Sequence, residues 1–183
     1  MYLIKTDSIG NVLWEKTYGG PSNDWGYSLQ QTMPDSGCII AGYTNSYGAG
    51  GYDVFLVKTD SLGNVLWEQT YGGPDWDYAY AVRQTADGGY IIAGETFSYG
   101  KGNSDAWLIR TDALGDTLWT RTFGGSGSET GYDVWQTTAG DFAMAGSSAS
   151  SGAGGYDMYL VITDPDGNNA VEKFIGGVLD DIA

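Results

Sequence analysis

The sequence predicts an all-β chain made of β-propeller blades, each a four-stranded antiparallel sheet supplied by one repeat of about 52 residues. The first observation behind this prediction is a stretch that recurs along the chain. Ile4–Pro21 returns as Val57–Pro74 with 15 of 18 positions identical, and more loosely as 109–126 and 161–178. The Thr-Asp pair inside it repeats at intervals of 53, 52 and 52 residues, ending at Asp7, Asp60, Asp112 and Asp164.

The second observation is that each repeat holds four short apolar segments separated by Gly, Asp and Asn turns. In the clearest repeat these segments are 79–85, 90–96, 106–111 and 117–123. Their apolar residues alternate or run continuously, without the 3.6-residue period of a helix. Four strands joined by hairpin turns favour a blade over the alternative, a β-solenoid, whose rungs usually come from shorter repeats.

The repeat boundaries divide the chain into units. Residues 1–20 supply an outer half-blade, residues 21–73, 74–125 and 126–177 supply one blade each, and residues 178–183 begin another. A propeller closes with four to eight blades. About 3.5 blades cannot close a ring alone, so we expect neighbouring blades from a longer chain or, as the less favoured alternative, further copies of this one.

Composition excludes several function classes. The chain is rich in Gly and in aromatic residues, with 30 Gly, seven Trp and fourteen Tyr, which favours a folded protein with many tight turns. Its net charge of −15 argues against nucleic acid and anionic membranes as partners. No apolar run is long enough for membrane insertion. The single cysteine, Cys38, lies in an apolar segment and reads as a buried thiol.

Two segments carry a resemblance to a known family. Residues 72–94 (GGPDWDYAYAVRQTADGGYIIAG) and 53–67 (DVFLVKTDSLGNVLW) resemble the β-propeller repeats of large bacterial and archaeal secreted or surface proteins. These repeats are called SBBP-type, and their layout is similar to kelch. The resemblance covers nearly the whole chain and implies export and a binding or scaffolding role within a larger protein. The fourth unit departs from the pattern, with Val171 in place of the recurring Trp.

Residues that recur in register are expected to be structural. Trp14, Trp67 and Trp119 occupy one strand position in successive units, which favours packing between blades over sugar stacking. Asp24, Asp77 and Glu129 follow the Gly-Gly turn of each unit. A carboxylate that repeats at one turn usually accepts backbone N–H hydrogen bonds, so we predict this role for all three.

Aromatic residues that do not recur are the better candidates for ligand binding. Trp25 and Trp76 are expected in the loop before the first strand of their units. Trp135 is expected in the first strand itself, at the position that Arg83 occupies in the preceding repeat. If that strand is innermost, these residues line a central channel. They are the candidate site for a glycan or protein ligand, with exposed loop or packing positions as the alternative.

A calcium ion is the only cofactor for which a candidate site exists. Asp164, Asp166 and Asn168 alternate in a D-x-D-x-N run, and this spacing lets oxygen side chains converge on one hard cation. The same run is also typical of a hairpin turn, because the first unit carries Asp7–Asn11, with fewer acids, at the equivalent position.

Catalysis finds little support in the residue types, and the class that composition leaves open is a two-carboxylate glycosidase, which would need one unrepeated pair of acids facing a cleft. The chain has no His, which excludes a Ser-His-Asp triad, a Cys-His pair and His-ligated zinc. Asp133 and Asp141 are the only clearly unrepeated acids of residues 126–177, and both are expected at the surface. We therefore predict a non-catalytic extracellular module for binding or scaffolding, with a carbohydrate-binding propeller and a self-assembling ring or fibre subunit as alternatives.

Overall fold

The computed structural model describes residues 1–182 and is all-β, with fourteen strands in four antiparallel sheets and no helix among the described residues. The N-terminal hairpin pairs β1 (Tyr2–Thr6) with β2 (Val12–Thr17). Sheet I contains β3 (Asp24–Gln31), β4 (Cys38–Thr44), β5 (Asp53–Thr59) and β6 (Val65–Tyr71). Sheet II contains β7 (Asp77–Gln84), β8 (Tyr90–Thr96), β9 (Asp105–Thr111) and β10 (Thr117–Phe123). Sheet III contains β11 (Glu129–Gln136), β12 (Phe142–Ser148), β13 (Asp157–Thr163) and β14 (Val171–Ile175).

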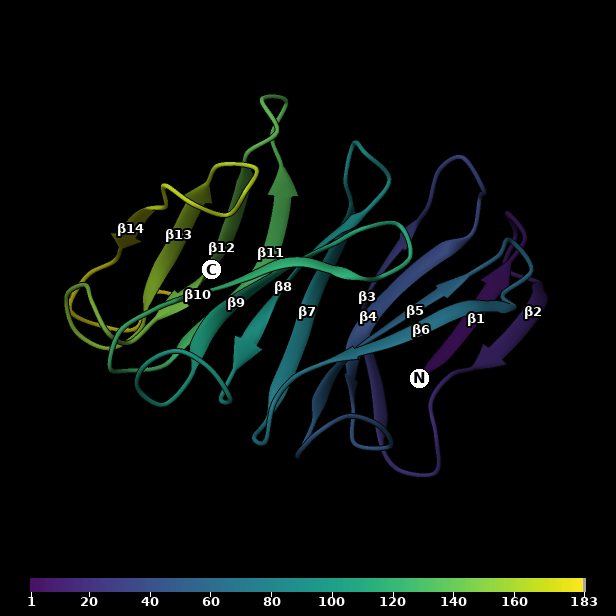
Figure 1. Cartoon of the computed structure of the whole chain (residues 1–183), viewed down its shortest axis with the longest axis horizontal. Coiled ribbons are helices and arrows are strands. Elements are labelled where there is room, and N and C mark those ends of the chain that lie inside the picture. The colour runs from purple at the N-terminus through teal and green to yellow at the C-terminus, as the bar shows by residue number, and fades with distance from the viewer. Residues whose placement is uncertain (183) are drawn as a thin grey trace.

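Within each sheet, spatial order follows chain order, so every strand pairs with its sequence neighbour. The sheets succeed one another across the molecule, from the hairpin near the N-terminus to sheet III near the C-terminus (Figure 1). The first strand of sheet II, β7, lies against the first strands of both neighbours, β3 and β11. This arrangement fits blade-like repeats, but the four sheets form an open array and are not closed into a ring.

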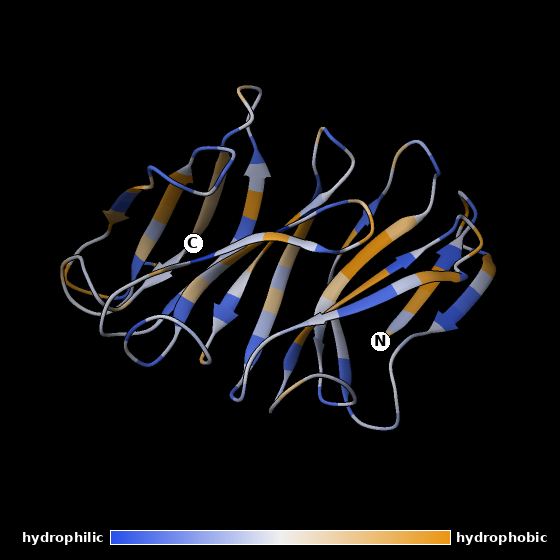
Figure 2. Cartoon of the chain, viewed as in Figure 1, coloured by the Kyte–Doolittle hydropathy of each residue, from blue (hydrophilic) through white to orange (hydrophobic). Residues whose placement is uncertain are grey.

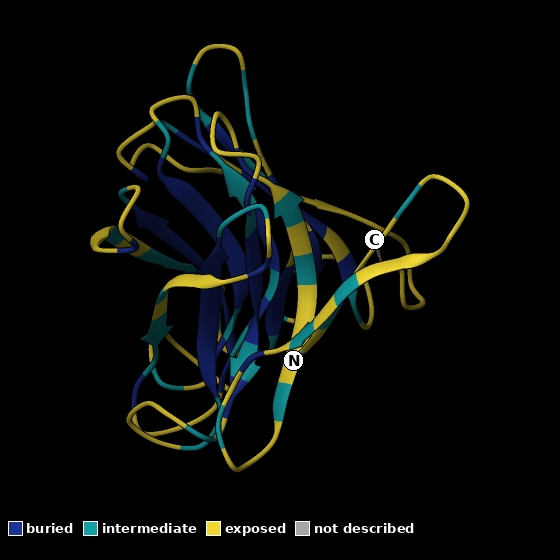
Figure 3. Ribbon diagram, turned by 90° about the vertical axis from the view of Figure 1, so that its right-hand side faces the viewer, coloured by how far each residue is buried: buried dark blue, intermediate teal, exposed yellow. Residues whose placement is uncertain are grey.

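The hydrophobic core lies between consecutive sheets. One cluster joins the hairpin to sheet I around Tyr18 and Phe55, a second joins sheets I and II, and a third joins sheets II and III. Hydrophobic residues concentrate on the strands (Figure 2), and the buried strands lie in the interior of the stack while the connecting loops are mostly exposed (Figure 3). Each sheet therefore depends on its neighbour to cover its apolar face.

The burial of the third strand of sheets I, II and III depends on whether a neighbouring sheet covers it. Every residue of β5 and β9 is buried, because each strand lies between two sheets. In β13, buried residues alternate with more exposed ones, including Met158 and Ile162. At the register position of Ile162 the other sheets carry Lys58 and Arg110, each paired with a carboxylate. The face of sheet III that carries Met158 and Ile162 is not covered by any other sheet of residues 1–182.

Strand bounds largely follow the sequence prediction. The structure places β8 and β10 at the predicted residues, while β7 begins at Asp77 and β9 at Asp105. Residues 178–182 form no strand, and Ala183, the last residue of the expected next unit, lies outside the described residues. Cys38 is free and half-buried, and burial raises the pKa of its thiol. Within residues 1–182, no helix is long and apolar enough to cross a membrane.

Candidate functional site

The first strand of each of sheets I, II and III contains a β-bulge, and the residue at that bulge is a tyrosine. The register of β3 against β4 skips Tyr27, that of β7 against β8 skips Tyr80, and that of β11 against β12 skips Tyr132. A bulge leaves one residue unpaired and redirects its side chain, and bulges are frequent beside functional sites. In each of these three strands, the bulge thus removes one tyrosine from the regular alternation of side chains between the two faces of the sheet.

These three tyrosines form a continuous row across the sheets, which we call the tyrosine row. The rings of Tyr27 and Tyr80 meet edge to face with centroids 5.5 Å apart, and those of Tyr80 and Tyr132 lie 5.8 Å apart. Tyr27 and Tyr132 are 54% and 40% exposed, so the row offers ring surface to solvent. Aromatic side chains supply large contact area at low conformational cost, which suits them to recognition.

Each tyrosine hydroxyl of the row faces a side chain of the adjacent strand. The three oxygen–oxygen distances are 3.3 Å for Tyr27–Tyr43, 3.4 Å for Tyr80–Glu95 and 3.5 Å for Tyr132–Ser147. Burial, followed by the nearby Glu95 carboxylate, raises the pKa of Tyr80. Burial also raises the pKa of Glu95. Tyr80 therefore keeps a neutral hydroxyl group that can donate or accept a hydrogen bond.

Further rings extend the row into a larger patch, the aromatic surface. Tyr43 packs between Tyr27 and Tyr78 with centroids 5.4 and 4.7 Å away, and Tyr52 contacts both Trp25 and Trp76 at 5.4 and 6.3 Å. The aromatic surface comprises nine rings linked by such contacts: Trp25, Tyr27, Tyr43, Tyr52, Trp76, Tyr78, Tyr80, Phe97 and Tyr132.

The three tryptophans proposed from the sequence divide into two groups. Trp25 and Trp76 belong to the aromatic surface and are bridged by Tyr52. The expectation that both precede the first strand is wrong for Trp25, which lies in β3, paired with Tyr43. The backbone begins pairing at Asp24, where the carboxylate ties the turn to the sheet, so the strand starts before Trp25.

Trp135 does not join the other two tryptophans. It is 64% exposed on β11, at the register position where sheet II carries Arg83. Arg83 points toward sheet III, so by register Trp135 points to the side of sheet III that no described sheet covers. No ring of the aromatic surface contacts it within residues 1–182. Trp135 therefore lies apart from Trp25 and Trp76 in residues 1–182, and a shared lining of a central channel by the three stays a prediction.

Arg83 is engaged within the protein. Its Nη2 lies 2.7 Å from Oδ1 of Asp133 in sheet III, and its Nη1 donates to the carbonyl of Val82 at 2.9 Å. The ion pair connects two first strands, so the structure gives Arg83 a role in holding sheets together. The same contact occupies Asp133, one of the two unrepeated acids of the third unit.

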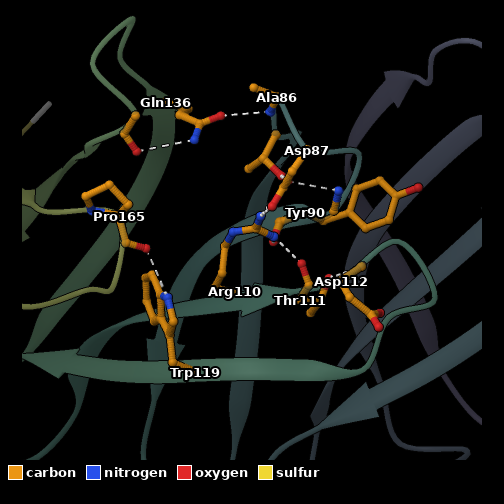
Figure 4. A network of polar contacts seen from close by, with 12 residues as sticks. Ala86, Asp87, Tyr90, Arg110, Thr111, Asp112, Trp119, Gln136 and Pro165 are labelled. Atoms are coloured by element: carbon orange, nitrogen blue, oxygen red, sulfur yellow. Dashed lines mark hydrogen bonds and ion pairs between the residues drawn. The ribbon is translucent and has the colours of Figure 1, made fainter.

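Other polar contacts between and within sheets II and III are drawn in Figure 4. Arg110 is buried and donates from Nη2 to both carboxylate oxygens of Asp87 at 2.6 Å, and from Nη1 to the carbonyl of Tyr90 at 3.1 Å. Gln136 of sheet III accepts from the backbone N–H of Ala86 at 2.9 Å. These contacts secure the turn between β7 and β8, so they are structural.

The recurring tryptophans lie at the junctions between units. A Cβ built on the turn glycines Gly63, Gly115 and Gly167 would meet the rings of Trp14, Trp67 and Trp119 at 2.9, 3.0 and 2.9 Å. The Trp119 indole N–H also donates to the carbonyl of Pro165 at 3.2 Å. Each tryptophan thus packs on the β-turn of the following unit.

The recurring carboxylates accept hydrogen bonds at each Gly-Gly turn. The backbone N–H groups of Gly20, Gly73 and Gly125 donate to Asp24, Asp77 and Glu129 at 3.0, 2.8 and 2.7 Å. Hydroxyl groups complete each set: Thr44 and Ser46 bind Asp24, Thr96 and Ser98 bind Asp77, and Ser148 binds Glu129. Their oxygens are used to hold the turns.

Two of the three candidate calcium ligands, Asp164 and Asn168, already accept hydrogen bonds with their side-chain oxygens. Asp164 Oδ1 accepts from the backbone N–H of Asp166 at 3.0 Å and of Asn168 at 2.7 Å, and these bonds lower the pKa of Asp164. Asn168 Oδ1 accepts from Arg121 at 3.1 Å. The described residues contain no group of three or more His, Cys, Asp or Glu side chains that could hold a metal ion.

Comparison with known proteins adds a distant similarity. No family model matches the chain. The regulatory protein FlaEY of Caulobacter vibrioides is 26% identical over 160 residues, in an alignment that covers 74% of this chain. The chain spans 17% of the length of that protein.

Proposed function

We propose that this chain is a non-catalytic repeat module of the β-propeller type, that its sheets are blades, and that its function is to bind a ligand within a larger exported or cell-surface protein. Three in-register sheets, packed by repeated contacts, support the blade assignment. The greater length of the similar protein, which is named as regulatory, supports a module within a larger chain.

The tyrosine row is the observation that carries the binding proposal. Packing between sheets uses Trp67, Trp119 and the buried strands, whereas Tyr27 and Tyr132, at the bulges of sheets I and III, remain exposed. Interfaces that recognise partners are enriched in tyrosine and tryptophan, with polar groups around them. The aromatic surface has this composition, and although its rings contact one another from sheet to sheet, Tyr27 and Tyr132 keep exposed ring area for a ligand.

A pair of matched variants tests the proposal. We expect Tyr27→Ser with Tyr132→Ser to weaken binding of a ligand, found by screening oligosaccharide and peptide panels, by about tenfold or more. Tyr2→Ser with Tyr47→Ser is the control, because these tyrosines are 61% and 44% exposed but lie outside the aromatic surface. A ligand that binds wild type and both variants equally would contradict the proposal.

Self-association is a second candidate function, favoured by the uncovered face of sheet III. Met158 and Ile162 are exposed there, and Trp135 lies on the same side. A face that meets a different surface on the next copy would produce rings or fibres. Light scattering over a range of concentrations tests this candidate. A rise in mass that Ile162→Lys abolishes supports it, and a mass that stays that of a monomer contradicts it.

A further inference from the structure

A hollow of about 330 Å³ beside sheet II is lined by side chains that sheets I and III lack at the same positions. It is lined by Asp75, Trp76, Phe97 and Asn103. Asp75 and Trp76 precede β7, Phe97 follows β8, and Asn103 lies just before β9. The hollow thus forms where the loops of sheet II converge, at one border of the aromatic surface.

The backbone identifies the equivalent positions in the other sheets. The N–H of Phe97 donates to the carbonyl of Trp76 at 2.9 Å. The same bond joins Asn45 to Asn23 in sheet I at 3.1 Å, and Ala149 to Ser128 in sheet III at 2.9 Å. Since the turn forms with Asn–Asn and Ser–Ala pairs, folding does not require the Trp–Phe pair.

The two rings form an inclined pair open to solvent. Trp76 and Phe97 are 53% and 39% exposed, with centroids 6.3 Å apart and planes inclined by 68°. Gly51 lets the backbone approach the indole, because a Cβ there would lie only 2.0 Å from Trp76 Cδ1. One side of the indole therefore packs on the Gly51 backbone, and the rest of its surface remains accessible.

Two polar side chains stand beside the rings. The Asp75 N–H donates to Ser98 Oγ at 3.1 Å and the Asn103 N–H donates to the Gly127 carbonyl at 3.0 Å, so both backbones are held in place. Neither side chain forms a hydrogen bond with another group in residues 1–182. A carboxylate and a carboxamide together can accept from and donate to neighbouring hydroxyl groups.

We propose that this hollow, as a subsite of the binding surface proposed above, binds a pyranose ring of a neutral oligosaccharide; the inference rests on that proposed function. The C–H groups on one face of a sugar ring are weakly positive and pack on the negative face of an aromatic ring. The hydroxyl groups at the ring edge meet Asp75 and Asn103. The excess of 23 acidic over 8 basic residues disfavours an acidic sugar.

The surrounding rings indicate a ligand longer than one sugar. Phe97 contacts Tyr78 at 6.3 Å, and Tyr78 contacts Tyr80 of the tyrosine row at 6.4 Å. Stacking surfaces therefore continue from the hollow across sheet II, and the row's hydroxyls provide hydrogen-bonding groups along the way. An oligosaccharide can place successive rings along this path.

The test compares the wild type with a double variant in which Trp76 and Phe97 are replaced by asparagine, the residue that sheet I carries at both positions. Calorimetry and tryptophan fluorescence are recorded with cellohexaose, chitohexaose, laminarihexaose and mannohexaose, and with a decaproline peptide as a different ligand class. We expect at least one hexasaccharide to bind, Trp76→Asn with Phe97→Asn to weaken it by about tenfold or more, and Trp135→Ala to leave it unchanged. An unchanged Tm confirms that the double variant folds.

Two results would overturn the inference. The first is that none of the four hexasaccharides binds the wild type, and the second is that the double variant binds a hexasaccharide as tightly as the wild type. The peptide arm separates this failure from failure of the proposed function. If decaproline binds and Tyr27→Ser with Tyr132→Ser abolishes its binding, the aromatic surface remains the ligand site while the saccharide assignment fails.

Discussion

Trp67 of sheet I lies against Gly115, in the β9–β10 turn of sheet II. A Cβ on Gly115 would meet the Trp67 ring at 3.0 Å, and the Tyr71 hydroxyl donates to the Gly115 carbonyl at 2.5 Å. Gly115 also has a φ of +85°, which side chains disfavour. One glycine therefore serves both the turn and the contact between sheets.

Replacing this glycine should cost more than backbone strain alone. We expect Gly115→Ala to lower the free energy of unfolding by about 2–4 kcal/mol, from strain and crowding together. Gly88→Ala is the control, because Gly88 has a φ of +88° but no atom within 4 Å of its Cβ position. It should cost only about 1–2 kcal/mol. Equal losses in urea denaturation would refute the packing role of Gly115.

Two arginine–aspartate pairs should differ in their contribution to stability. Asp87→Asn leaves the guanidinium of Arg110, 5% exposed, without its carboxylate, which should cost about 2 kcal/mol because Asp87 itself is 66% exposed and partly screened. Asp133→Asn leaves Arg83, which is 26% exposed, and should cost about 1 kcal/mol or less because water screens this pair. Denaturation of both variants checks the order, and a larger loss for Asp133→Asn would contradict it.

The half-buried Glu95 carboxyl should make stability depend on pH. Burial raises its pKa above the ordinary value of 4.5, so the ionised form is less favourable in the folded chain than in the unfolded chain. Glu95→Gln should therefore stabilise the protein above the folded-state pKa, and this gain should fade as the pH falls from that pKa toward 4.5 and be absent below 4.5. Tm values of both proteins across the acid range test the sign. A gain that grows toward acid would be inconsistent with it.

Calcium should have no effect on the turn at Asp164. Its carboxylate is occupied by two backbone N–H groups, and Asn168 accepts from Arg121. We expect the same Tm in millimolar calcium chloride and in EGTA. If calcium instead raised the Tm and Asp166→Ala removed the rise, the D-x-D-x-N run would be a metal site after all.

The fold was predictable because the pattern repeats. The apolar run at β8 and the glycine turns around β10 place both strands at their observed bounds. The site was less predictable. Tyrosine recurs visibly at Tyr27, Tyr80 and Tyr132, but alternation along a strand does not reveal a bulge, which changes the face on which a side chain lies. The partner of Arg83 is 50 residues away and unrepeated, so no local signal connects it to Asp133.

The most direct test of the binding surface is NMR chemical-shift mapping of the isotope-labelled chain with any ligand found in the panels. We predict that the largest backbone shifts fall on the strands that carry Tyr27, Tyr80 and Tyr132. The shifts should extend to the loops of Trp76 and Phe97 when the ligand is a saccharide. Shifts that instead centre on Trp135, Met158 and Ile162 would place binding on the uncovered face of sheet III and contradict the account.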